Sequence, residues 1–418
     1  MFSEAQMQAF WRFKSISLKG LTTTCGQALH IIEPGQYNAH QGPDFTNARI
    51  KVGDVTWAGN IELHLRTSDW VRHAHELDEH YKNIILHVVW FNDVANYTLS
   101  PLLELSKFIA VEQLQQEDDS PSSYHLHCNL NERTPIEIAS YSDLQQLGIE
   151  RLLFRKEQVS QMFHLHKLDY SSVLWRLIFR SFGRSTNADT FETLFLSIPI
   201  HVFRLYAFDV QLIEALMMGQ SNLLYEPIMD DYPQTLLKHY VILKHRHDLH
   251  PIAEKMKFLR MRPRNFPTIR LAQLAAFFHR NLTLVKQLLT IEDLKEVDDL
   301  FDITTHPYWY SHFLFDRKSI DQFKEIGQSV RQQTIVNAFI PFLMAYAEIN
   351  KIPSCKEKAL RWLDELRPEQ DALIRLYSAL GFKAHTISDT QSLHELYIRY
   401  CLHRKCSSCA RGKMLQLV

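Results

Sequence analysis

The spacing of apolar residues changes once along this chain of 418 residues, and that change limits the folds open to it. Up to about residue 115, short segments alternate apolar and polar residues, as β-strands do. From about residue 135 onward, apolar residues recur every three or four positions, which predicts amphipathic helices. Glycine is scarce, at 12 residues, whereas turn-rich all-β proteins use more of it. We therefore predict an α+β protein in which a domain with a mixed sheet precedes a larger all-α domain.

The predicted boundaries are a folded domain over 1–115, a linker or loop over 116–134, and an all-helical domain over 135–418. The linker is predicted from a polar run with one proline at 114–123. The net charge of −1 provides no global field to attract nucleic acid or a membrane, so any such binding has to be local.

Cysteine content and the absence of targeting signals favour a cytoplasmic protein. Six cysteines in a chain of this length do not make a disulfide scaffold. The first residues lack the basic flank and long apolar core of a signal peptide. No apolar run approaches about 18 residues, so we expect no segment to span a membrane. The oligomeric state stays open.

The first 115 residues predict the element order helix, strand, strand, strand, helix, strand. The expected elements are a helix at 4–14, strands at 29–33, 48–52 and 57–66, a helix at about 69–83, a strand at 84–91 and an edge strand within 101–111. Ser68 is the expected N-cap of the second helix.

Two acidic residues stand out because of where they fall on these strands. Asp44 directly precedes one strand, and Glu62 lies on the next, two residues before His64. Because side chains alternate along a strand, Glu62 and His64 share its polar face. Carboxylates that meet at one point can hold Mg²⁺ or Mn²⁺, which neutralises phosphate charge and activates water. The alternative is a turn aspartate that caps a backbone amide and a glutamate on a solvated face.

This spacing predicts a metal site for phosphodiester hydrolysis. Asp44 and Glu62 would hold the cation, and His64 would assist the water or the phosphate. Histidine is charged for only part of the time at neutral pH, so a neighbouring cation can take over that role. The side chains expected around the site are Arg66, Lys51, His73 and Asp69.

Three cysteines near the C-terminus, Cys401, Cys406 and Cys409, form a second cluster. Cys-x2-Cys with a third cysteine nearby suits a structural zinc ion or an iron–sulfur cluster. The fourth ligand would come from one of three residues, His403, Cys128 or Cys25. The alternative is a tail whose thiols are buried by packing.

A basic segment around two prolines is the third candidate site, and it precedes a helix expected at 269–280. Arginine forks suit phosphates and a phenyl ring can stack on a base, so the segment is a candidate for holding nucleic acid. The residues are Arg260, Arg262, Arg264, Phe266 and Arg270. The alternative is a set of arginines that bond helix carbonyls and acidic neighbours.

The elements around Asp44 and Glu62 resemble the core of the PD-(D/E)xK nucleases. In that fold an aspartate enters the second strand, and a glutamate and a lysine lie on one face of the third, over a divalent ion. Here His64 stands where lysine is usual, which bears on catalysis more than on fold. The resemblance implies a metal-dependent nuclease, and the alternative is a non-catalytic nucleic-acid-binding or scaffold protein with a degenerate nuclease fold.

The chain also resembles, almost end to end, an uncharacterised bacterial family, domain of unknown function 2851. The segments that carry the resemblance are Gly42-Pro43-Asp44-Phe45, Glu62-Leu63-His64, Ser68-Asp69-Trp70, His73-x-His75, Leu86-His87-Val88-Val89, Arg262-Pro263-x-Asn265-Phe266-Pro267 and the cysteine tail. This family brings no established activity, and it implies a cytoplasmic protein of unknown role.

Overall fold

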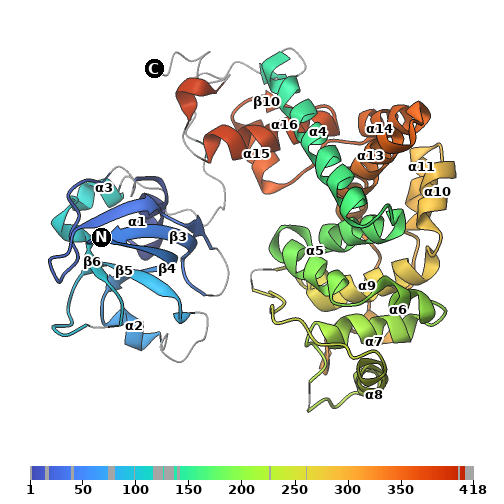
Figure 1. Cartoon of the computed structure of the whole chain (residues 1–418), viewed down its shortest axis with the longest axis horizontal. Coiled ribbons are helices and arrows are strands. Elements are labelled where there is room, and N and C mark those ends of the chain that lie inside the picture. The colour runs from blue at the N-terminus through green and yellow to red at the C-terminus, as the bar shows by residue number, and fades with distance from the viewer. Residues whose placement is uncertain are drawn as a thin grey trace. The chain divides into compact units, whose positions relative to one another are not determined.

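The computed structural model divides into two compact units, shown in Figure 1. The sheet unit comprises residues 1–127 with 400–406, and the helical unit comprises 128–399 with 407–418. The described residues are 2–14, 18–38, 42–73, 81–97, 99–115, 126, 136–138, 142–225, 227–259, 261–402 and 405–409. The predicted linker at 116–134 lies almost wholly outside them, so it stays a prediction.

The sheet unit is a mixed sheet with few helices, as predicted. Its elements are α1 (Glu4–Lys14), β1 (Leu29–Glu33), β2 (Gln36–Tyr37), β3 (Phe45–Val52), β4 (Val55–Arg66), α2 (Asp69–Arg72), β5 (Ile84–Phe91), β6 (Leu102–Glu104) and α3 (Val111–Gln115). The strand order is β1-β3-β4-β5-β6, with β2 paired to β3. Strands β1, β3 and β4 are antiparallel neighbours, whereas β5 joins β4, and β6 joins β5, in parallel. The predicted element order is confirmed, with β2 added.

Apolar residues of α1 and the sheet form the core of the sheet unit. Met7, Phe10 and Trp11 of α1 are buried together with Phe45 and Leu63 of the sheet. Side chains alternate along β4, so its neighbouring polar residues face the other way. The polar face of β4 is nevertheless buried as well, which is unusual for charged side chains and marks it as a candidate site.

Ser68 is the N-cap residue of α2, as predicted, although its side chain makes no capping hydrogen bond. Its amide and hydroxyl both donate to the carboxylate of Asp93, over 2.9 and 2.6 Å. This aspartate follows β5 and accepts both hydrogen bonds that Ser68 donates, while the serine oxygen accepts none from the first turn of α2. Much of the remainder of the predicted helix, at 74–80, lies outside the described residues.

The helical unit is mostly, rather than wholly, helical. Two short strand pairs correct the all-α prediction, β7 (Ile136–Glu137) with β10 (Phe382–Lys383) and β8 (His312–Leu314) with β9 (Arg317–Lys318). The helices are α4 (Ser142–Leu165), α5 (Tyr170–Leu196), α6 (Ile200–Leu205), α7 (Val210–Gln220), α8 (Asp231–Arg246), α9 (Pro267–Arg280), α10 (Leu284–Thr290), α11 (Leu294–Leu300), α12 (Gln328–Thr334), a π-helical turn (Ile335–Phe339), α13 (Ile340–Asn350), α14 (Pro353–Glu365), α15 (Ala372–Ala379) and α16 (Ile387–Leu396), followed by a second π-helical turn (Tyr397–Cys401). None of the described helices has the length and apolar character that a membrane crossing needs.

Helix α5 is kinked at Arg184, whose φ of 54° and ψ of −160° are far from helical values. Residues other than glycine rarely adopt this backbone conformation, so the backbone is strained at Arg184. A Cβ at the preceding Gly183 would lie 2.9 Å from the backbone of Ala188, so the kink requires glycine. The side chain of Asn187 exchanges two hydrogen bonds of 2.9 Å with the backbone of Lys257 and holds the kink in place.

A buried acid in α7, Glu214, makes the stability of the helical unit depend on pH. Burial raises its pKa from 4.5 to about 7. The folded state therefore keeps this proton longer than the unfolded state does. The stability that results is fully present below pH 4.5 and is lost as pH rises to about 7.

We expect Glu214→Gln to gain about 2 kcal/mol of unfolding free energy relative to wild type between pH 5 and pH 8. The amide oxygen still accepts the hydrogen bond that Trp309 Nε1 donates to Glu214 Oε1 at 2.6 Å. Urea unfolding at the two pH values measures the difference. A difference between the proteins that is the same at both pH values would contradict the prediction.

Candidate functional site

Strand β4 extends beyond the point where β3 begins. Acidic side chains from α1, from the residue before β3 and from β4 itself lie at this end of β4. On that edge the amide of Leu63 donates to Asp44 Oδ2 at 3.0 Å, in place of a further β3 residue. The amide of Leu65 donates to the carboxylate of Glu4, in the first turn of α1. The two carboxylates thus occupy the open edge of β4.

Asp44 and Glu62 meet at this edge. The amide of Asp44 donates to Glu62 Oε2 at 2.9 Å, and Gln8 Nε2 of α1 donates to Asp44 Oδ1 at 2.7 Å. Burial and the charges of neighbouring acids raise the pKa of both carboxyls well above their usual range. Burial, aided by the charge of Asp69, also raises the pKa of Glu4 to about 7. Acids placed this close together favour either bound protons or a bound cation.

The imidazole rings of His64, His73 and His87 contact one another, and His64 lies next to Glu62. His64 Nε2 lies 3.6 Å from Glu62 Oε1 and 3.2 Å from His73 Nδ1, and His64 Nδ1 lies 2.8 Å from His87 Nε2. Both His64 and His87 are buried. His73 therefore lies at the position that the sequence predicts, while His64 is enclosed by other groups.

Of the other side chains predicted around the metal site, Asp69 and Arg66 lie close to it and Lys51 lies far from it. Asp69 Oδ2 accepts the amide of Arg66 at 3.0 Å, and Asp69 Oδ1 pairs with Arg72 at 2.8 Å. The side chains of Arg66 and Arg72 are exposed. Lys51 lies opposite Thr56, at the other end of β3 from Asp44, so it is not positioned to take part.

Two residues of the site were not assigned to it from the sequence. Glu4 comes from α1, and only tertiary packing brings it to β4. His87 is a polar residue inside the apolar strand Ile84–Phe91, which was the available signal.

The cysteine cluster stays a prediction. Cys401 and Cys409 are buried, Cys406 is half-buried and Cys25 is exposed. Cys401 and Cys406 belong to the sheet unit and Cys409 belongs to the helical unit. The other proposed ligands, His403 and Cys128, lie outside the described residues.

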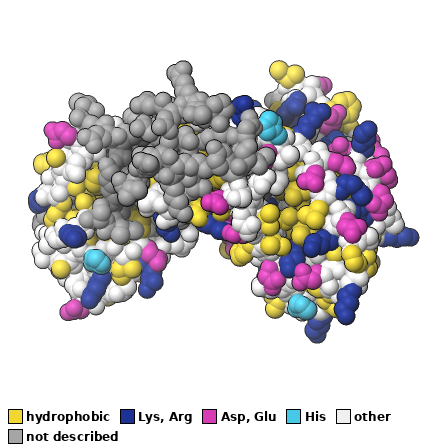
Figure 2. Space-filling model, turned by 90° about the horizontal axis from the view of Figure 1, so that it is seen from above, with side chains coloured by type: hydrophobic (Ala, Val, Ile, Leu, Met, Phe, Trp, Pro, Cys, Tyr) yellow, Lys and Arg dark blue, Asp and Glu magenta, His cyan; other side chains and the backbone are white. Residues whose placement is uncertain are grey.

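Two residues of the predicted nucleic-acid segment contact other residues of the helical unit. Arg270 is buried and donates to Gln273 Oε1 at 2.8 Å and to the side chain of Asn265. Phe266 packs against Phe258, with ring centroids 5.4 Å apart. Of the remaining residues, Arg262 and Arg264 are exposed, and Arg260 lies outside the described residues. On the face of the helical unit in Figure 2, basic and acidic side chains are interspersed, so that face offers no extended basic surface.

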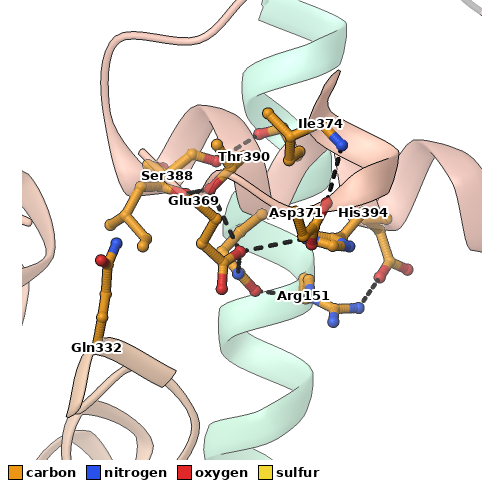
Figure 3. A network of polar contacts seen from close by, with 12 residues as sticks. Arg151, Gln332, Glu369, Asp371, Ile374, Ser388, Thr390 and His394 are labelled. Carbon is orange, nitrogen blue, oxygen red and sulfur yellow. Dashed lines mark hydrogen bonds and ion pairs between the residues drawn. The ribbon is translucent and has the colours of Figure 1, made fainter. Parts of the chain in front are cut away.

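A second group of potential metal ligands lies in the helical unit and comprises Glu369, Asp371 and His394 (Figure 3). Within the described part of the chain, it is the one group of three or more His, Cys, Asp or Glu residues whose ligand atoms all lie within 4.8 Å of one another. Although burial acts against it, hydrogen bonding to Asp371 and Glu369 raises the pKa of His394 to about 9. Sequence analysis missed this group because His394 is on α16, far along the chain from the loop that carries the acids.

The fold and its acidic sites define an α+β protein with a mixed-sheet unit and a mostly helical unit. The family described as "Protein of unknown function (DUF2851)" matches residues 4–372, and the chain belongs to this family. No curated protein and no solved structure shows a significant match. The nuclease resemblance therefore depends on the residues around Asp44 and Glu62 alone.

Proposed function

We propose that the sheet unit is a divalent-metal-dependent phosphodiesterase that acts on nucleic acid. The observation that carries this proposal is the meeting of Glu4, Asp44 and Glu62 at one end of β4, where burial raises the pKa of all three. Buried carboxylates near one another cost stability unless protons or a cation compensate them, and such groups concentrate at functional sites.

The donor set fits magnesium or manganese. Mg²⁺ commonly binds through one or two carboxylates and keeps several water ligands, so Asp44 and Glu62 suffice to hold it. Such an ion would neutralise phosphate charge and lower the pKa of a bound water. Leu63 and Gln8 orient the carboxylate of Asp44 through their hydrogen bonds. His64, next to Glu62, would exchange a proton or stabilise a phosphate oxygen.

The positions of these residues support the PD-(D/E)xK resemblance. Asp44 directly precedes β3, and Glu62 and His64 lie together on β4. Because Arg270 is buried and Phe266 packs against Phe258, nucleic acid would instead meet the exposed arginines beside the site. Arg66 and Arg72 are in this position, and both are able to bind phosphate.

We expect Asp44→Asn and Glu62→Gln each to lower Mg²⁺- or Mn²⁺-dependent cleavage of mixed DNA and RNA by about 100-fold or more. Lys51→Ala is the matched control, since this exposed residue lies at the far end of β3, and its activity should equal that of wild type. Gel assays with purified protein measure the rates. Equal traces of cleavage in all four proteins would contradict the proposal.

One observation favours a non-catalytic alternative. Both ring nitrogens of His64 already face other histidines. The position that lysine usually occupies in PD-(D/E)xK nucleases therefore has no cation available to bind phosphate. A nucleic-acid-binding or scaffold protein with a degenerate nuclease fold would have this arrangement. Salt-sensitive binding of nucleic acid without metal-dependent cleavage would identify it.

A further inference from the structure

A cavity in the helical unit has the features of a second binding site. It measures about 680 Å³ and is lined by residues of α4, α5, α16 and the π-helical turn Ile335–Phe339. A neighbouring cavity measures about 420 Å³. Glu369, Asp371 and Arg184 line both, so the acidic pair is accessible from two sides.

Three side chains that line the larger cavity have the separations of a metal ligand set. His394 Nε2 lies 3.2 Å from Glu369 Oε2 and 3.0 Å from Asp371 Oδ2 (Figure 3). A metal ion with ligands at about 2.0–2.2 Å brings its donor atoms to within about 3–3.5 Å of one another. These three atoms could therefore surround an ion after only a small movement, with release to solvent of the proton that His394 Nε2 shares with the two carboxylates.

Other hydrogen bonds fix both carboxylates in place. Asp371 Oδ1 accepts the amide of Ile374 at 2.9 Å and so caps α15. Glu369 Oε2 accepts Gln391 Nε2 at 2.9 Å and lies 3.5 Å from the hydroxyl of Thr390. Metal-binding carboxylates are typically held by such bonds, which reduce the cost of ordering them.

Two arginines in the cavity wall indicate an anionic ligand. Among the described residues, neither Arg155 nor Arg184 has a carboxylate oxygen within 4.0 Å, although both line the cavity. Both arginines are half-buried, and Arg155 donates to the amide oxygen of Gln391 at 3.2 Å. Half-buried cations that lack a direct ion pair attract anions, so they are suited to hold a bound anion.

A buried polar atom and two backbone irregularities point to the same cavity. Within the described part of the chain, Asn337 Oδ1 is buried without a hydrogen-bond partner, and this residue lines the cavity. It lies on the π-helical turn, and the strained Arg184 lies on the opposite helix, α5. A buried oxygen without a hydrogen-bond partner is costly, and a ligand with a hydrogen-bond donor would remove that cost. Both π-helical turns and strained backbone are frequent at functional sites.

We propose that Glu369, Asp371 and His394 bind a divalent transition-metal ion, and that Arg155 and Arg184 hold a phosphate- or carboxylate-bearing ligand of that ion in the adjoining cavity. One imidazole with two carboxylates suits Zn²⁺ or Mn²⁺. This site is separate from the carboxylate site of the sheet unit and does not depend on its activity.

Calorimetric titration of chelator-treated, full-length Glu62→Gln protein with Zn²⁺ or Mn²⁺ tests the metal site without a contribution from Glu62. We expect one equivalent of metal to bind at Glu369, Asp371 and His394, and Asp371→Asn and His394→Gln to weaken binding of that equivalent by about 100-fold or more. Asparagine is itself a good helix N-cap, so Asp371→Asn should keep the fold. Glu395→Gln, on the same helix as His394, is the control that should bind as the parent does.

The anion arm uses inorganic phosphate and the zinc-loaded protein. Arg155→Gln should weaken phosphate binding by about tenfold or more, while Lys156→Gln, whose amine pairs with Glu348 at 2.8 Å, should not. Failure of zinc to bind the parent, or binding that is unchanged in Asp371→Asn and His394→Gln, would overturn the metal site. Zinc binding without arginine-dependent phosphate binding would overturn the anion site.

Discussion

Replacing Glu62 with glutamine is expected to raise the unfolding free energy of the metal-free sheet unit by about 3 kcal/mol at pH 8. Burial and the charge of Asp44 raise the pKa of Glu62 well above its usual value of 4.5. The stability that goes with this proton is fully present below pH 4.5 and is lost as pH rises through the raised pKa. An amide has no such proton to lose, and its oxygen can still accept the Asp44 amide that now bonds Glu62 Oε2.

Hydrogen exchange of the β4 and β5 amides, measured in chelator at pH 5 and pH 8, reports the stability of the sheet unit separately. Wild type should lose protection between the two values after correction for intrinsic exchange, and Glu62→Gln should lose much less. Asp54→Asn, an exposed change in the turn between β3 and β4, is the control expected to follow wild type. Parallel profiles for Glu62→Gln and wild type would show that the carboxylates do not strain the fold.

Gly219→Ala is expected to destabilise the helical unit by about 3 kcal/mol or more. A Cβ at this position in α7 would lie 2.1 Å from Cγ of Tyr240 in α8, a distance that no packed side chain tolerates. The ring cannot easily yield, because Tyr240 is buried and its hydroxyl donates to Gln220 Oε1 at 3.0 Å. The two helices would have to separate, which exposes apolar surface.

Gly327→Ala is the matched control for this change. It precedes α12 with an ordinary φ of −66°, and an added Cβ would meet no atom within 4 Å. We expect its unfolding free energy to lie within about 0.5 kcal/mol of wild type. Urea unfolding compares the three proteins, and equal stabilities for both alanine variants would rule out the steric argument.

Local periodicity was sufficient to predict most elements, because strands and helices impose periods of two and 3.6 on buried positions. The helix predicted at 269–280 begins at Pro267, and the strand at 84–91 has the predicted limits. The strand predicted at 48–52 begins earlier, at Phe45. There the alternation is hidden by Asn47, whose φ of 56° interrupts the register with β4.

Some residues of the candidate sites were also predictable from local sequence, whereas others depend on long-range contacts. Asp44 and Glu62 were linked from the sequence because adjacent strands carry them. Glu4 reaches them only through the packing of α1, and His394 meets Glu369 only through the packing of α16. Such pairings depend on tertiary contacts that a periodic pattern does not encode, and the same is true of Arg270, which the packing of α9 buries.

The carboxylates at the open end of β4 have a consequence for how this protein avoids aggregation. Unpaired strand amides are templates on which another polypeptide can add a strand. Here the amides of Leu63 and Leu65 already donate to Asp44 and Glu4, so they are not available to the carbonyl groups of an incoming strand. Removing either acid would therefore uncover a docking edge, and self-association would accompany the loss of that side chain.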